Sequence, residues 1–317
     1  MIYLHKQLHF FIANNFITNH MPQSLETLNS RFGLTNTLFF ANHAAGLPVA
    51  EIQTPLARAH VALHGAHVLA WQPAGQQPVI WVSQAARYEP GQAVRGGVPV
   101  CWPWFGARDG LPAHGFVRTR LWHMRETSLD ADGQVRLRLG ISDDASTRAL
   151  WNHAFDLELI VTVGQTLTMA LVTRNTGTQA FTLTDALHTY FGVADIAQTT
   201  VRGLEGCTYL DKVQNFAECS QTGVVSFSAE TDRVYVNTSA ECVIDDRAGQ
   251  RQIHVAKQGS TSTVVWNPWS EREKSIADMA AGEHRRMLCV ETCNAGPDKI
   301  TLAAQGIHTL TARISVA

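Results

Sequence analysis

The sequence predicts an all-β protein, folded as one continuous β-sandwich. From about residue 57 to the end of the 317-residue chain, apolar and polar residues alternate with a period of two, as they do in half-buried strands. A helical period is hard to find. No composition break, low-complexity linker or repeat of about 20 to 50 residues divides the chain. Together these observations favour one large β domain over two smaller ones.

Two segments have the pattern of a β-hairpin. In FDLELIVTVGQTLTMALVTRN, residues 155–175, alternating apolar residues lead into a Gly164-Gln165 turn, after which the alternation resumes. In ECVIDDRAGQRQIHVAK, residues 241–257, the turn residues lie between Asp245 and Gly249. GIHTLTARISV, residues 306–316, predicts a further strand. Short helices are expected only near DDASTRALWNHA, residues 143–154, and SQAAR, residues 83–87.

The N-terminal segment MIYLHKQLHFFIANNFI contains a short apolar run, but Asn14 and Asn15 interrupt it and no A-x-A cleavage site follows. We therefore do not expect a signal peptide, and no other segment approaches the length of a membrane span. Residues 1–20 are interpreted as a poorly ordered extension, and residues 21–317 as one β-sandwich domain.

The composition narrows the class of protein. Apolar residues make up 45% of the chain and charged residues 16%, which is typical of a compact globular protein. The formal net charge of -2 gives no reason to expect nucleic acid as a partner. The six cysteines contain no C-x-x-C pair, which favours reduced thiols in a cytoplasmic protein.

Three histidines, His60, His64 and His67, lie close together in AHVALHGAHV. On a strand, His60 and His64 share one face, and His67 faces the other unless the glycine makes a bulge. No H-E-x-x-H motif or carboxylate follows. We therefore expect structural histidines, no metal site, and an activity that a chelator leaves unchanged.

Two ionisable residues lie in apolar strand patterns. In AFTLTDALHTYFGV, apolar residues at odd positions place His188 and Tyr190 on the opposite face, which is either solvent surface or the floor of a sugar site. In RRMLCVETCN, Glu291 interrupts an otherwise apolar strand. A buried carboxylate needs a partner or a raised pKa, whereas an edge-strand glutamate would face water. This segment alone leaves both interpretations open.

Basic residues gather in two glycine-containing segments. LPAHGFVRTRLW, residues 111–122, has His114 next to a glycine, and Arg118 and Arg120 on one face of a predicted strand. VRGGVPVCWPWFG, residues 94–106, has Arg95 before two glycines, where a guanidinium either binds an oxyanion or is a surface charge beside a turn. Three aromatic residues of this segment are either core or a platform for a sugar ring: Trp102, Trp104 and Phe105.

Taken together, these segments resemble the aldose 1-epimerase (galactose mutarotase-like) superfamily, and within it the hexose-6-phosphate mutarotase, or glucose-6-phosphate 1-epimerase, branch. The resemblance covers roughly residues 57–316 and rests on these segments in this order: VRGGVPVCWPWFG, LPAHGFVRTRLW, ALHTYFGVADI, TDRVYVN, VVWNPW and IADMAAGEHRRMLCVET. It implies a large antiparallel β-sandwich whose concave face holds the sugar. It also implies an isomerase that interconverts α and β anomers without a cofactor.

The resemblance implies roles for individual residues as well. Carried over by motif, the catalytic acid is His188 and the base is Glu291. Four more residues match positions that bind the sugar or its 6-phosphate: His114, Asp232, Arg95 and Arg118. Arg120, on the same predicted face as Arg118, is a weaker candidate for the phosphate contact.

Anomerisation needs two groups of opposite proton status, because the ring oxygen gains a proton while the C1 hydroxyl loses one. A histidine with a pKa of about 6.5 is suited to act as the acid, and a glutamate with a pKa of about 4.3 is suited to act as the base. We expect the nearby carboxylate to favour the imidazolium form of His188.

The expected partner is a small hexose 6-phosphate, and the expected state is a monomer that contacts neither nucleic acid nor membrane. The alternative from another class is a non-catalytic β-sandwich module that binds carbohydrate or regulates. A glycoside hydrolase would require two carboxylates flanking the scissile bond, whereas the strongest pair here is a histidine and a glutamate.

Overall fold

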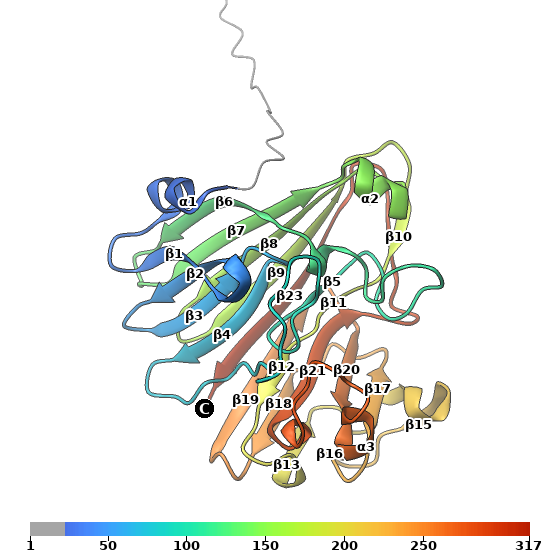
Figure 1. Ribbon diagram of the computed structural model, residues 1–317. Coiled ribbons are helices and arrows are strands. Elements are labelled where there is room, and N and C mark those ends of the chain that lie inside the picture. The colour runs from blue at the N-terminus through green and yellow to red at the C-terminus, as the bar shows by residue number, and fades with distance from the viewer. Residues whose placement is uncertain (1–22) are drawn as a thin grey trace, which may run out of the picture.

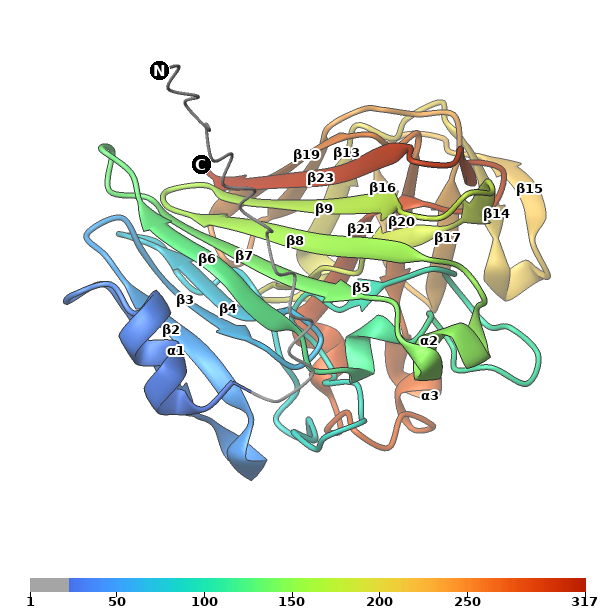
Figure 2. The same ribbon diagram turned by 90° about the horizontal axis from the view of Figure 1, so that it is seen from above.

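The computed structural model describes residues 23–317, so the expected extension, residues 1–20, lies outside the described residues. Strands dominate the described part and form four antiparallel sheets (Figures 1 and 2). The all-β prediction is therefore confirmed.

The largest sheet has nine strands. In order across the sheet they are β16 (Val225–Ser226), β13 (Thr199–Arg202), β18 (Cys242–Asp246), β19 (Arg251–Gln258), β23 (Ile307–Val316), β9 (Leu167–Asn175), β8 (Phe155–Val163), β7 (Val135–Ser142) and β6 (His123–Leu129).

The second large sheet has eight strands. In order they are β15 (Ala217–Ser220), β14 (Thr208–Asp211), β17 (Thr231–Tyr235), β20 (Ser262–Asn267), β21 (Met287–Asn294), β11 (Asp185–Leu187) and β5 (Val100–Cys101), with β12 (Tyr190–Gly192) also paired to β21.

Two smaller sheets and a few short helices complete the described residues. The four-stranded sheet runs β1 (Leu38–Asn42), β2 (Pro48–Gln53), β3 (Ala57–Ala62) and β4 (His67–Pro73), and the two-stranded sheet pairs β10 (Phe181–Leu183) with β22 (Ile300–Leu302). The α-helices are α1 (Leu25–Phe32), α2 (Ala145–Leu150) and α3 (Trp269–Glu273). The 3-10 helices are η1 (Ala44–Gly46), η2 (Val117–Thr119), η3 (Ile196–Gln198), η4 (Lys212–Gln214) and η5 (Glu283–Arg286).

One hydrophobic core joins the sheets. It contains Phe40 of β1, Leu157 of β8 and Leu310 of β23, together with Leu288 and Val290 of β21. Because strand residues alternate between faces, burying Val290 in this core turns its neighbour Glu291 to the opposite face of the eight-stranded sheet. The core therefore decides which side chains of β21 can reach a ligand.

Most of the elements that local sequence patterns predict are present in the structure. β8 and β9 pair antiparallel around the turn at Gly164, and β18 pairs with β19, so both hairpins are confirmed, as is the C-terminal strand β23. The helix expected near residues 143–154 is α2, whose N-cap Asp144 and residue Thr147 bond reciprocally.

Other local predictions were wrong. SQAAR forms a turn, because the backbone N–H of Ser83 donates to Arg95 and its hydroxyl donates to Glu283, leaving no helical ladder. The helices α1 and α3 were not expected, since elements of eight and five residues carry little periodic signal.

The segment around His188 is not one strand but three short ones, β10, β11 and β12. Between them the backbone N–H groups of Thr184 and His188 donate to the carbonyls of Pro103 and Pro99, at 3.1 and 3.0 Å. This pairing with the proline-containing segment interrupts the strand and places His188 in the gap between β11 and β12.

The strand predicted through Arg118 and Arg120 is wrong. Residues 117–119 form η2, so alternation does not apply and the two arginines point to different places. Arg120 donates to the hydroxyl of Ser146 at 2.8 Å and lies over the ring of Phe116. It has no place in the pocket described below, which removes it as a phosphate candidate.

The six cysteines of the described residues are free thiols. No helix among residues 23–317 is long and apolar enough to cross a membrane.

Candidate active site

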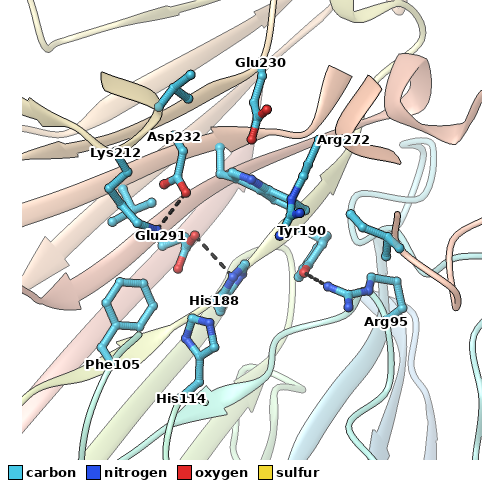
Figure 3. Close-up of a pocket in the computed structure, with 14 residues that line it drawn as sticks. Arg95, Phe105, His114, His188, Tyr190, Lys212, Glu230, Asp232, Arg272 and Glu291 are labelled. Atoms are coloured by element: carbon cyan, nitrogen blue, oxygen red, sulfur yellow. Dashed lines mark hydrogen bonds and ion pairs between the residues drawn. The ribbon is translucent and has the colours of Figure 1, made fainter. Parts of the chain in front are cut away.

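A pocket of ≈ 520 Å³ opens on the face of the eight-stranded sheet that is turned away from the shared core (Figure 3). The predicted site residues that line it are Arg95, His114, His188, Asp232 and Glu291. Arg118 is not among the lining residues. Residues that the sequence had not assigned also line it, including Lys212, Glu230, Trp266 and Arg272.

Glu291 lies at the centre of the sheet. Its strand, β21, pairs with β20 on one side and with β11 and β12 on the other, and its side chain is 1% exposed. The edge-strand interpretation is therefore wrong. Its Oε1 lies 3.4 Å from Nε2 of His188, and its Oε2 has no hydrogen-bond partner among the described residues.

His188 is held by aromatic rings. It stacks on Tyr190 with ring centroids 4.9 Å apart and an interplanar angle of 11°, and Tyr190 in turn stacks on Trp81. The edge of Trp266 packs against His188 at 6.2 Å. Its Nδ1 has no hydrogen-bond partner within residues 23–317. This packing orients the imidazole and leaves Nε2 directed toward Glu291.

Burial controls the protonation of this pair. Desolvation, then electrostatic interaction with His114, Arg118 and Arg95, holds the pKa of His188 well below its ordinary value. Desolvation also raises the pKa of Glu291 well above its ordinary value, with Lys212 opposing the shift. The expectation that the carboxylate favours imidazolium is therefore wrong for the free protein, because burial outweighs the attraction between the two charges.

His114 lies beside this pair, with its ring 5.7 Å from that of His188. It has a positive φ of 62°, and its Nδ1 accepts from the backbone N–H of Gly106. The following Gly115 is required, because a Cβ there would overlap the carbonyl oxygen of Trp102. Burial, then Arg118, lowers the pKa of His114 to about 3, so the imidazole is neutral.

Asp232 and Lys212 form an ion pair on one side of Glu291, with Nζ and Oδ2 2.7 Å apart (Figure 3). The second oxygen of Asp232, Oδ1, is buried and has no partner among the described residues. Burial raises the pKa of Asp232, and Lys212 opposes that shift. The pair thus presents an acceptor and a cation to any ligand beside Glu291.

Arg95 lies on the other side of His188 (Figure 3). Its Nε donates to Asp278 at 3.0 Å and its Nη1 donates to the hydroxyl of Tyr190 at 3.1 Å. Arg118, in contrast, donates to the carbonyl of Ala113, the residue that precedes His114 in the sequence. It acts on the site through its charge, since it lowers the pKa of both His114 and His188.

Arg272 of α3 reaches the same pocket and was missed by the sequence interpretation. Its Nη1 donates to the hydroxyl of Ser275 at 3.2 Å, and no carboxylate within residues 23–317 forms an ion pair with it. Lys212 and Arg95 are each paired with an aspartate. The pocket therefore contains one arginine whose charge is still available to an anionic ligand.

The remaining candidates have structural surroundings. Trp102 and Trp104 belong to the core, whereas Phe105 lines the pocket. His64 accepts from the backbone N–H of Gly91, and Nε2 of His67 lies 2.8 Å from the carbonyl of Gly96. His60 and His43 have ring centroids 6.4 Å apart. These histidines lie apart from the pocket lining.

Known proteins with similar sequences and structures identify the family of this chain. The family described as "Aldose 1-epimerase" matches residues 48–315. A protein of Escherichia coli (strain K12) named "Putative glucose-6-phosphate 1-epimerase" is 41% identical over 252 residues, covering 78% of this chain and 84% of its own length. A protein of the same name from Salmonella typhimurium is 39% identical, with the same coverage.

The solved structure described as a "putative mutarotase" from Salmonella typhimurium superposes with a TM-score of 0.83 at 36% identity, covering 90% of this chain and 95% of that one. With a family match over most of its length, the chain belongs to the aldose 1-epimerase family.

Proposed function

We propose that this protein is a hexose-6-phosphate mutarotase that interconverts the α and β anomers of glucose 6-phosphate. The observation that carries the proposal is the pairing of His188 with Glu291 at 3.4 Å in a pocket that also holds Arg95 and Arg272. Named relatives at 41% and 39% identity support the same substrate class.

The reaction opens the pyranose ring and closes it on the other face of the aldehyde. Glu291 takes the proton of the C1 hydroxyl while Nε2 of His188 gives a proton to the ring oxygen, and the C1–O5 bond breaks. Rotation about the C1–C2 bond presents the other face of the carbonyl. The two residues then act in reverse, so no cofactor and no net proton change are required.

The active protonation state differs from that of the free protein, in which burial favours neutral forms of both groups. A phosphate dianion beside Arg95 offsets one of the positive charges that lower the pKa of His188. Lys212 meanwhile remains next to Glu291 and favours its carboxylate form. Substrate binding thus shifts the shared proton from Glu291 to His188.

The phosphate clamp that we propose consists of Arg95 and Arg272. Arg272 takes the place that the sequence had given to Arg118, because only Arg272 lines the pocket and has no carboxylate partner among the described residues. Arg–phosphate contacts are charge-assisted and often bidentate. The unpaired Oδ1 of Asp232, beside Lys212, is the proposed acceptor for a sugar hydroxyl.

Anomer exchange measured by NMR tests the proposal. Starting from the pure α anomer, the protein should speed equilibration of glucose 6-phosphate above the spontaneous rate, and do so more strongly than for glucose. A protein that binds glucose 6-phosphate yet leaves the spontaneous rate unchanged would instead be a carbohydrate-binding module.

A further inference from the structure

The proton-transfer pair has a third close neighbour, the thiol of Cys289. One donor atom from each of His188, Cys289 and Glu291 lies within 4.8 Å of the others, and all three residues are buried. The mechanism proposed above uses the histidine and the glutamate but has no role for the sulfur.

Strand register explains why the three donors meet. Cys289 and Glu291 are two positions apart on β21, so both side chains lie on the pocket face. Tyr190 is the direct partner of Cys289 across the β12–β21 pair, and Leu187 is the partner of Thr292. His188 therefore comes in beside Glu291 and close to the sulfur.

The donor set is one that Zn²⁺ prefers: imidazole nitrogen, thiolate sulfur and carboxylate oxygen. Zinc bonds of about 2.0–2.3 Å at tetrahedral angles place neighbouring donor atoms about 3.3–3.6 Å apart. The His188–Glu291 distance of 3.4 Å falls in this range, and the sulfur of Cys289 lies within 4.8 Å of both donor atoms. Three protein ligands leave one tetrahedral position for water or another ligand.

We propose that Zn²⁺, or a divalent cation of similar softness, binds His188, Cys289 and Glu291 and inhibits the enzyme. The cation occupies the lone pairs of Nε2 and the carboxylate, which are the ones that the proton transfer requires. Binding of the metal stands on geometry alone, whereas inhibition rests on the proposed mutarotase function.

The same strand supplies a matched control. Cys293 lies two residues beyond Glu291, on the same face of β21, and is as completely buried as Cys289. Its sulfur lies 3.5 Å from the hydroxyl of Ser262, and it is not part of the three-donor cluster. The proposed metal site includes Cys289 as a ligand and does not include Cys293.

Titration of the full chain with Co²⁺, a spectroscopic substitute for zinc, tests binding without any activity measurement. Wild type and Cys293→Ala should develop the charge-transfer band of a Co²⁺–thiolate bond and the visible bands of four-coordinate cobalt. Cys289→Ala should lose the thiolate band. If wild type shows no thiolate band, or if Cys289→Ala keeps it, the proposed site is wrong. Cys289→Ser serves the same purpose should the alanine variant fail to fold, as judged by circular dichroism.

Inhibition is measured by anomer exchange with added Zn²⁺, relative to the metal-free rate of each variant. Wild type and Cys293→Ala should be inhibited and recover with EDTA, and Cys289→Ala should need at least about 10-fold more zinc, because even loss of a residue that supports a ligand weakens metal sites by this factor. Equal zinc sensitivity of all three variants would contradict the proposal. If the protein shows the cobalt bands but has no mutarotase activity, the proposed metal site stands and the proposed function is wrong.

Discussion

Two buried acid–base pairs in this molecule have opposite surroundings. Asp246 and Arg251 belong to the hairpin of β18 and β19, and their side chains are 0% and 7% exposed. Asp246 accepts from Arg251 and from the backbone N–H groups of Ala194 and Gly249. The other donors of Arg251 bind backbone carbonyls: those of Gln77, Pro78 and Gly192.

The pair of His188 and Glu291 is equally buried but incomplete. Nδ1 of the histidine and Oε2 of the glutamate have no partner among the described residues, and neither has Oδ1 of the neighbouring Asp232. An unsatisfied buried polar atom lowers the stability of the fold by about 1–3 kcal/mol. Such an atom therefore calls for an explanation, of which a functional role is one. The complete pair stabilises the fold, whereas the incomplete pair keeps unpaired polar atoms, as we propose that proton transfer requires.

The largest expected effect follows from Glu291→Gln, which keeps the shape of the side chain but cannot accept a proton. Anomer exchange of glucose 6-phosphate should fall by about 10²–10⁴-fold, while binding of the sugar phosphate survives. His188→Asn should act alike, and the double variant should lose little more than the worse single one, because both groups serve one proton transfer. Exchange rates and binding titrations check this. Near-normal exchange in either single variant would show that the acid and base are elsewhere.

Asp246→Ala should have the opposite effect: it should lower stability and leave catalysis intact. Removing one member of a fully bonded buried pair should lower the free energy of unfolding by about 3–5 kcal/mol, with the exchange rate of the folded fraction unchanged. The adjacent Asp245 is the control, since its partner Arg247 is 71% exposed and the pair should contribute about 1 kcal/mol or less. Urea denaturation of both variants measures the difference. A catalytic defect in folded Asp246→Ala would break the distinction between the two pairs.

Asp185 is a buried carboxyl outside the pocket whose oxygens also lack hydrogen-bond partners among the described residues, and it tests whether such a group can be unrelated to function. Both of its oxygens are buried without a partner in the described part of the chain, and burial raises its pKa to about 8. Since the folded pKa lies above the ordinary value of 3.8, the associated stability is present below about pH 4 and is lost as the pH rises to about 8.

Asp185→Asn should remove this pH dependence. The stability of the variant relative to wild type should increase by up to about 1.4 kcal/mol per pH unit between pH 4 and 8, with exchange activity retained. Thermal melts across this pH range provide the measurement. A parallel pH dependence in the two proteins would mean that the Asp185 carboxyl is ionised in the fold.

The smallest expected effects distinguish the arginines. Arg95→Ala and Arg272→Ala should each reduce kcat/KM for glucose 6-phosphate by about 10-fold or more, and by more than they reduce it for glucose, because the phosphate is the part of the substrate that the two arginines are proposed to contact. Arg120→Ala, outside the pocket, is the matched control and should change neither substrate. Equal losses on the phosphorylated and the free sugar would contradict the clamp.

Much of the architecture could be predicted from local pattern alone. The alternation in residues 155–175 and 306–316 gave β8, β9 and β23 in nearly their final bounds, because burial of one face of a strand repeats every second residue. The motif matches that named His188 and Glu291 led to two side chains that meet in one pocket. Trp266 could have been added, since it alternates with Val264 in VVWNPW.

The rest depended on contacts between distant parts of the chain. Lys212 and Arg272 carry no local signal, and they reach the pocket only because η4 and α3 are placed next to the sheet. Arg95 meets Asp278 across 183 positions of sequence. Arg118 and Arg120 diverge because residues 117–119 turn into a 3-10 helix under tertiary packing.

The sequence by itself therefore determined the strand periodicity and the fold class, and its motifs predicted the two groups that we propose carry the proton. Only the tertiary structure decided their proton affinities and their neighbours. The pKa of His188 falls and that of Glu291 rises because both are buried beneath several strands and loops at once. Desolvation of this kind is a property of everything packed around a group, and no residue pattern along the chain encodes it.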